Sequence, residues 1–359
     1  MACAHSTENQ SCVTQTSSAS SGNLLQFLNA DGASEELKFV WIATRLVINP
    51  VVLVWGILAS IVNIIVFCKL GLGEGVTQNF LILSVADGLL CLISSVSTFH
   101  YIVYWLGLDN GILAIHHMES LALFVFNYPL SLSLITTAVI AVVRCCCVNM
   151  PFKVRKLLTA RRQLLAILLL GLLDMSVMAY TNSCMRVLWH VQLPANLTYL
   201  FPVAFVESRC GENPLALYDL RRSIVFGLCF ATALVSMIVL FIALRKSSRF
   251  RRLATNTSRS IEIPEATTKE VRVVKSALLV LAVFTVCNFP LVLLSLIRQT
   301  RPEFGSDQET YFTFMWFISQ GLHFNAAFNI FIYYFSNSRY RKILKAVFQR
   351  RRTYAEGSQ

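Results

Sequence analysis

Charged residues are scarce in this chain of 359 residues, since Asp, Glu, Lys and Arg make up only 14% while 55% of the residues are hydrophobic. A water-soluble domain carries about 25% charged residues and hides its apolar residues in one core. With a mean hydropathy of +0.60, this protein has more apolar surface than such a core buries. The composition excludes an ordinary soluble domain and predicts a protein of the lipid bilayer.

Histidines and acidic residues are few and scattered, 6 and 19 in the whole sequence. A membrane hydrolase would need several of them near one membrane face to hold zinc. No Ser, His and Asp arrangement for nucleophilic catalysis can be placed either. The sequence therefore predicts that the protein is not an enzyme. The histidines are His5, His100, His116, His117, His190 and His323.

Lys and Arg outnumber the acidic residues by 31 to 19, which leaves a formal net charge of +12. The basic residues lie between long uncharged runs, not on the faces interleaved with aromatic side chains that bind nucleic acids. We therefore expect membrane lipids, and no nucleic acid, as the partner of this charge.

Seven long runs are almost free of charge, with Asp87 and Asp174 as the exceptions. Each is long enough for a helix that crosses the hydrocarbon core, which takes about 20 mostly apolar residues. Core helices of a large soluble protein would instead show polar stripes. The runs are Leu46–Cys68, Val76–Leu108, Ser120–Val143, Gln163–Met185, Ser223–Leu244, Ser276–Ile297 and Thr310–Ser338.

These runs predict an all-α membrane protein, a seven-transmembrane helix bundle with a cytoplasmic amphipathic helix. Residues 1–40 form an extracellular segment, 41–336 the bundle, and 337–359 the cytoplasmic helix and tail. That last helix alternates an apolar stripe with basic residues, which suits an anionic inner leaflet; a solvated charged tail is the alternative. The stripe consists of Tyr340, Ile343, Leu344, Val347 and Phe348.

The basic residues also predict the orientation, because 23 of the 31 lie on one side of the runs and 8 on the other. By the positive-inside rule the amino terminus is extracellular and the carboxyl terminus cytoplasmic, in the plasma membrane. Residues 1–12 lack a basic start and an apolar run, so the first span is expected to act as the targeting signal. The sequons at Asn9 and Asn196 lie outside in this topology and predict glycosylation there.

Polar residues inside the spans are candidates for function because they are costly in hydrocarbon. Asp87 and Ser133 lie mid-span, and Asn325, Asn329 and Tyr333 recur every four residues on one helical face. Hydrogen bonding that merely holds the helices together is the alternative. Asp174 is expected to face a neighbouring helix or a water cavity.

Residues at the span ends and one proline complete the pattern. Arg144 closes the third span and Glu270 opens the sixth, where Pro290 predicts a kink and a free carbonyl. Arg144 alone could be a positive-inside anchor.

Taken in order, these residues resemble the rhodopsin-like (class A) G-protein-coupled receptors over residues 41–348. Val143, Asn288 and Ile330 depart from the family pattern, and no Cys lies near Glu119. The Arg-Cys-Cys-Cys run and the short first inner loop resemble a divergent invertebrate branch, especially gastropod chemosensory and neuropeptide receptors. The matching residues are Asn63, Asp87, Arg144-Cys145 with Pro151, Phe284 with Cys287 and Pro290, and Asn329 to Tyr333 (NIFIY).

The resemblance implies a receptor that binds an extracellular small molecule or peptide and activates a heterotrimeric G protein by tilting of the sixth helix. No Asp or Glu lies on the third span, which argues against an amine ligand. For His323 the sequence favours a hydrogen-bonded packing role over a ligand contact. The implied pocket consists of Phe126, Asn127, Leu130, Asn288, Leu291 and His323.

The resemblance also implies a sodium site and a switch, and no other cofactor. Oxygen ligands suit a hard cation. Val143 removes the usual acidic neighbour of Arg144, so the closed state should depend on a pair between Arg144 and Glu270. The sodium cluster is Asp87, Ser133, Asn325 and Asn329, and the switch is Arg144, Glu270, Phe284, Pro290 and Tyr333.

Four of the eleven cysteines can reach the oxidising exterior, so at most two disulfides are expected. Cys184 with Cys210, or Cys12 with Cys210, are the candidates. The run Cys145 to Cys147 predicts small packing residues, with acylation as the alternative.

A multi-span transporter or channel is the alternative function. It would need an internal repeat, paired broken spans or a continuous polar pore, and the sequence shows no internal repeat of that kind.

Overall fold

The computed structural model describes residues 42–105, 113–150, 158–183, 185–192, 199–206, 214–257, 265–300 and 308–356. This part of the protein is nearly all helical, with one pair of strands. The elements in sequence order are η1 (Thr44–Ile48), α3 (Asn49–Leu70), α4 (Gly75–Trp105), α5 (Leu113–Asn149), α7 (Ala160–Ser183), β1 (Met185–Gln192), β2 (Tyr199–Val206), α8 (Pro214–Thr257), α9 (Glu265–Thr300), α10 (Gln308–Ser336) and α11 (Ser338–Glu356).

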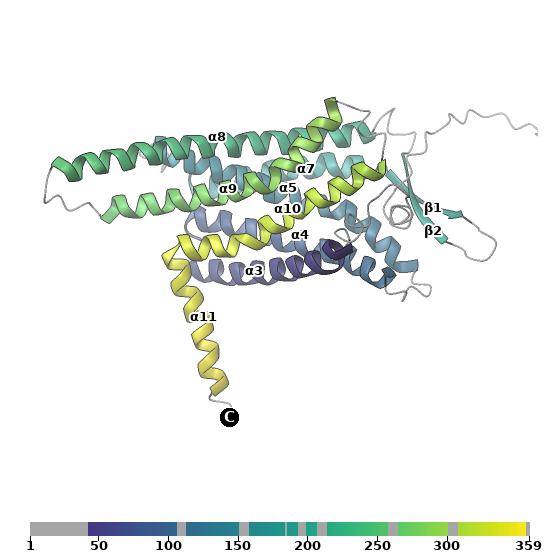
Figure 1. The fold of residues 1–359 in the computed structure, drawn as a ribbon, viewed down its shortest axis with the longest axis horizontal. Coiled ribbons are helices and arrows are strands. Elements are labelled where there is room, and N and C mark those ends of the chain that lie inside the picture. The colour runs from purple at the N-terminus through teal and green to yellow at the C-terminus, as the bar shows by residue number, and fades with distance from the viewer. Residues whose placement is uncertain are drawn as a thin grey trace, which may run out of the picture.

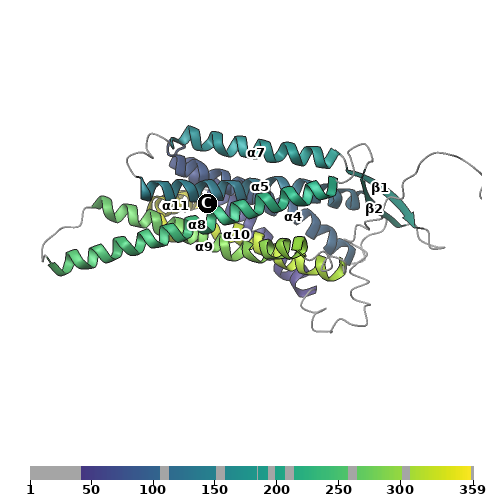
Figure 2. The ribbon, with the colours of Figure 1, turned by 90° about the horizontal axis from the view of Figure 1, so that it is seen from above.

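The long helices lie side by side in a bundle (Figures 1 and 2). Six of them form a closed ring of neighbours in the order α3, α4, α5, α8, α9 and α10, and α7 packs outside the ring against α5 and α4. At one end, here called the α11 end, α11 leaves the bundle and α8 and α9 extend beyond their neighbours (Figure 1). The β1–β2 pair lies at the opposite end, called the hairpin end.

Six helices contain a segment that is long and apolar enough to cross a membrane. The seventh predicted span corresponds to α10, which is not one of the six. Its described part buries Gln320, His323, Asn325 and Asn329, and these polar residues lower its hydropathy. α10 nevertheless closes the ring between α9 and α3. The six segments are Thr44–Leu70, Gly75–Phe99, Val125–Asn149, Ala160–Thr181, Leu220–Lys246 and Ala277–Ile297.

Large apolar side chains cover the outside of the bundle, most densely on the peripheral helix α7. Six leucines of α7 are between 48% and 64% exposed. Soluble monomers rarely expose a continuous apolar surface of this kind. Together with the six apolar segments, this surface indicates a multi-pass membrane protein. The six are Leu165, Leu168, Leu169, Leu170, Leu172 and Leu173.

The interior contains two main apolar clusters. One lies chiefly among α5, α8 and α9, around Phe226 and Phe284. The other lies at the α11 end, where Tyr333 of α10 contacts three rings at centroid distances of 5.1 Å, 4.9 Å and 5.8 Å, in the favourable range for aromatic pairs. This aromatic cluster joins α3, α4, α10 and α11. The three rings are Phe67, Phe80 and Tyr340.

The antiparallel hairpin is the one described element that the sequence prediction of an all-helical fold does not include. β1 pairs with β2 from Met185 opposite Val206 to Gln192 opposite Tyr199. Both strands are rich in β-branched and aromatic residues, which favour strands. The candidate disulfide residues Cys184 and Cys210, and the sequons at Asn9 and Asn196, lie outside the described residues.

α9 and α10 approach each other closely at Gly321. A Cβ atom added to Gly321 would lie 2.3 Å from the backbone oxygen of Cys287, so only glycine fits without moving one helix. This contact lies three residues before Pro290, which interrupts the hydrogen bonding of α9. The two helices are therefore in backbone contact next to Pro290.

We expect Gly321→Ala to lower stability by about 1–3 kcal/mol, because a backbone carbonyl cannot yield as a flexible side chain does. Thermal unfolding of the purified protein in detergent measures the effect. Gly227→Ala on α8 is the matched control, since nothing lies within 4 Å of its added Cβ. Equal unfolding midpoints for Gly321→Ala and Gly227→Ala would contradict the close approach of α9 and α10 at Gly321.

Candidate functional site

The carboxyl group of Asp87 connects three helices in the middle of the bundle. Asp87, on α4, is 2% exposed. Its Oδ1 accepts a hydrogen bond from Oγ of Ser133 on α5, and its Oδ2 accepts one from Nδ2 of Asn329 on α10, both at 2.7 Å. The structure thus brings together three of the four residues of the predicted sodium cluster. Asn325 is also buried, but the bonds of Asp87 within the described part of the protein go to the other two.

Both partners of the Asp87 carboxyl are neutral. Among the described residues no Lys or Arg pairs with it, so a carboxylate there would keep an uncompensated charge in a low-dielectric interior. A small cation or a proton would relieve this cost. The carboxylate and the Ser133 hydroxyl oxygen suit a hard monovalent ion. The described residues contain no group of three or more His, Cys, Asp or Glu that could hold a metal.

The aromatic cluster lies one helical turn from Asn329 toward the α11 end. Tyr333 is 2% exposed, and its hydroxyl has no hydrogen-bond partner among the residues that the structure describes. Beside it, the Tyr340 hydroxyl donates to Oδ1 of Asn63 at 2.5 Å. Burial raises the pKa of Tyr340 above its ordinary value, which keeps this phenol protonated as a donor. The bond fixes α11 to α3, a contact that sequence reasoning did not predict.

The sixth predicted span, in α9, is weakened around Pro290. Proline has no N–H, so the carbonyl of Val286 loses its helical partner. Just before the proline, Nδ2 of Asn288 donates to the backbone oxygen of Phe284 at 2.8 Å, and such side-chain bonds to the i−4 carbonyl often bend helices. Phe284 itself is 1% exposed and packs in the cluster with α5 and α8. α9 therefore has a deformable segment next to a tightly packed one.

The predicted ligand-pocket residues come from α5, α9 and α10. Phe126 meets the ring of His323 edge-on at 6.4 Å, and Leu130 and Leu291 belong to one apolar cluster. Asn127 and Asn288 are buried. All six residues lie in the interior or partly so, on the helices that line the ring.

His323 also belongs to a polar network that sequence reasoning missed. Its Nε2 lies 2.9 Å from Oγ of Ser94 on α4, and Thr98, one turn further, accepts a hydrogen bond from Nδ2 of Asn49 on α3 at 2.8 Å. Nδ1 of His323 and Oδ1 of Asn288 are buried without a partner among the described residues. In the sequence, Ser94 and Thr98 lie four residues apart, and this spacing, which puts both hydroxyl groups on one face of α4, could have indicated the network.

Asp174 forms a buried ion pair across α7 and α8. Its Oδ1 lies 2.6 Å from Nη1 of Arg221, and both side chains are only 5–6% exposed. This contact is with a neighbouring helix, one of the two surroundings that the sequence left open for Asp174. Sequence reasoning did not single out Arg221, because it lies at the start of the apolar part of α8 and counts as an outer-loop charge.

The predicted pair of Arg144 and Glu270 stays a prediction. Arg144 is partly buried at the α11 end of α5, and no ion pair joins it to any residue that the structure describes. The side chain of Glu270 lies outside the described residues. At the same end, Arg339 of α11 and Glu74 form an exposed ion pair at 2.9 Å.

No family model matches the protein, and no curated protein is significantly similar to it. A function can therefore be inferred only from the residues and geometry of the bundle.

We expect Asp174→Leu and Arg221→Met each to lower the unfolding free energy by about 3–5 kcal/mol, because each leaves the opposite charge in the interior. The double variant should regain most of that loss. Thermal unfolding in detergent measures the cycle. Glu74→Gln, which breaks the exposed pair with Arg339, is the control and should change stability by about 1 kcal/mol or less. Additive losses in the double variant would show that the pair is not coupled.

Proposed function

We propose that the protein is a rhodopsin-like G-protein-coupled receptor of the plasma membrane, with α10 as the seventh span. The Asp87 carboxyl supports this most directly, because it joins α4, α5 and α10 through hydrogen bonds to neutral partners. A receptor needs two packings of nearly equal free energy. A buried polar junction that a cation or proton can tune meets this need.

The neighbouring elements supply the moving part. α9 contains Pro290 and the Asn288 side-chain bond, so its part toward the α11 end can tilt about this segment. Phe284 packs against α5 and α8 on that side of the pivot, and its displacement would open the α11 end. Arg144 lies at that end, where the basic residues of 245–275 would face a heterotrimeric G protein.

The charge distribution supports the orientation. The connections and tail at the α11 end contain 23 of the 31 basic residues, which supports a cytoplasmic location of this end and a position of α11 along the inner leaflet. The amino terminus is then extracellular.

The ligand would enter between α5, α9 and α10 from the hairpin end. Phe126, Leu130 and Leu291 offer apolar contacts, while Asn127, Asn288 and His323 offer neutral polar ones. No acidic residue lies on α5 beyond Glu119, so the pocket suits an uncharged or anionic group better than an amine. An external chemical cue or a neuropeptide fits this description.

A sodium ion at Asp87 and Ser133 would neutralise the carboxylate and favour the packing in which Asn329 bonds to it. We expect added Na⁺, compared with the same concentration of a large organic cation, to raise the melting temperature of the natural protein. Asp87→Asn should abolish this difference. Ser84→Ala is the control, because its hydroxyl donates to Phe80 on its own helix. A sodium effect that survives in Asp87→Asn would refute the site.

The receptor function predicts nucleotide exchange on a G protein in reconstituted vesicles, which neither a transporter nor a channel would catalyse. Because Val143 leaves Arg144 without an acidic neighbour, the protein should show exchange without ligand. Glu270→Ala should raise this basal rate. Glu265→Ala, five residues earlier on α9, is the control and should not. If the protein catalyses nucleotide exchange on none of a panel of G-protein classes, the proposed mechanism is contradicted. An unchanged basal exchange rate in Glu270→Ala would also contradict it.

A further inference from the structure

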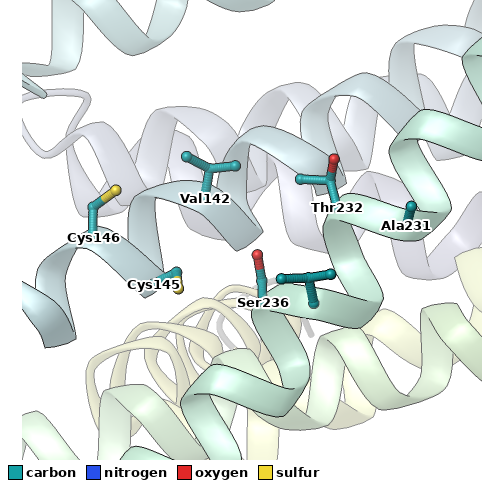
Figure 3. A pocket seen from close by; sticks show the side chains of 7 residues that line it. Val142, Cys145, Cys146, Ala231, Thr232 and Ser236 are labelled. Carbon is teal, nitrogen blue, oxygen red and sulfur yellow. The ribbon is translucent and has the colours of Figure 1, made fainter.

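A groove of about 400 Å³ opens between α5 and α8. Figure 3 shows its walls: Val142, Cys145 and Cys146 come from α5, and Ala231, Thr232 and Ser236 from α8. Its volume is in the range of small-molecule sites. The walls are mainly hydrocarbon and thiol, with two hydroxyl groups as the polar exception.

The groove faces the lipid side of the bundle. Val142 and Val235, which also line it, are 42% and 59% exposed. Walls of this apolar character suit a hydrocarbon tail better than a polar ligand. The chemistry of the walls and their exposure to lipid both favour an acyl group as the occupant.

Two thiols lie in the groove wall at the end of α5. Cys145 and Cys146 are free and partly exposed, within the last five residues of a helix that ends at Asn149. Nδ2 of Asn149 donates a hydrogen bond to Sγ of Cys145 at 3.6 Å. Cys147, the third member of the run, does not line the groove. Thiols next to the membrane surface are the usual sites of reversible acylation.

We propose that Cys145 and Cys146 form an S-acylation site whose long acyl group lies in the groove between α5 and α8. The thiolate of either residue attacks the carbonyl carbon of a long-chain acyl-coenzyme A thioester. The new sulfur–carbon bond forms as the bond to coenzyme A breaks, and the cysteine proton goes to the departing thiolate. No oxidant or reductant is needed.

This modification would act on the receptor directly. α8 and α5 are neighbours in the ring, and an acyl group between them fills the space on their lipid side, beside Cys145, which directly follows Arg144 in the sequence. Residues 288–359 contain no cysteine, so no residue of α11 can carry a thioester. The inference rests on the proposed orientation, because acyl-coenzyme A is cytoplasmic, but not on G-protein coupling.

Acyl exchange on the full-length protein expressed in animal cells tests the modification. Free thiols are blocked, thioesters are cleaved with neutral hydroxylamine, and the released thiols receive a polymer mass tag. We expect a hydroxylamine-dependent mass step that is lost when Cys145→Ser and Cys146→Ser are combined. Cys147→Ser, the matched control, should keep it. The proposal would be overturned if the mass step is absent from the natural protein or persists in the double variant. Its disappearance in Cys147→Ser would overturn the proposal as well.

Thermal unfolding tests where the acyl group lies. Hydroxylamine treatment should lower the melting temperature of the natural protein but not of Ala231→Phe, which fills the groove with a side chain. An equal decrease in both proteins would overturn the groove as the site. Co-purified phospholipid without the mass step would identify a free lipid tail and also refute acylation. Protease access to a carboxyl-terminal tag in sealed cells checks the orientation separately, and nucleotide exchange is measured independently of both.

Discussion

The hydrogen-bonded carboxyl group of Asp87 is the constraint on which the arrangement of this bundle depends. A charged or polar group in hydrocarbon must find partners inside the protein, and here the partners come from residues that are 46 and 242 positions away. α4, α5 and α10 must meet at this point for the group to be satisfied. Both partners are neutral, so no described residue offsets the charge of this carboxyl group when it is ionised.

The position of α10 follows from the same requirement. Its buried polar residues set it apart from the six apolar segments, yet it closes the ring because those residues have partners inside: Asn329 at Asp87 and His323 at Ser94. Gly321 then allows α9 to approach at the backbone level. α10 thus contacts both α9, three residues before Pro290, and the polar junction at Asp87.

The two ends of the bundle have different chemistry. At the α11 end, four aromatic rings and the bond from Tyr340 to Asn63 fix α11 against α3 and α10. Buried polar atoms without a partner among the described residues occur both toward the hairpin end, at Nδ1 of His323, and at the α11 end, at the Tyr333 hydroxyl. The groove between α5 and α8 adds a third surface, which faces lipid.

The sequence by itself determined that the protein belongs in a membrane, where its apolar segments lie and how its basic residues are divided, because composition and charge order are properties of local sequence. It also indicated which polar residues are costly, Asp87 and Asp174 among them. Only the tertiary structure decided what these residues bind. The pairing of Asp174 with Arg221, the contact of Ser94 with His323 and the groove beside Cys145 depend on which helices are neighbours, and helix neighbours are set by packing across the whole bundle. The hairpin was missed for the same reason: its strands are stable only as a pair.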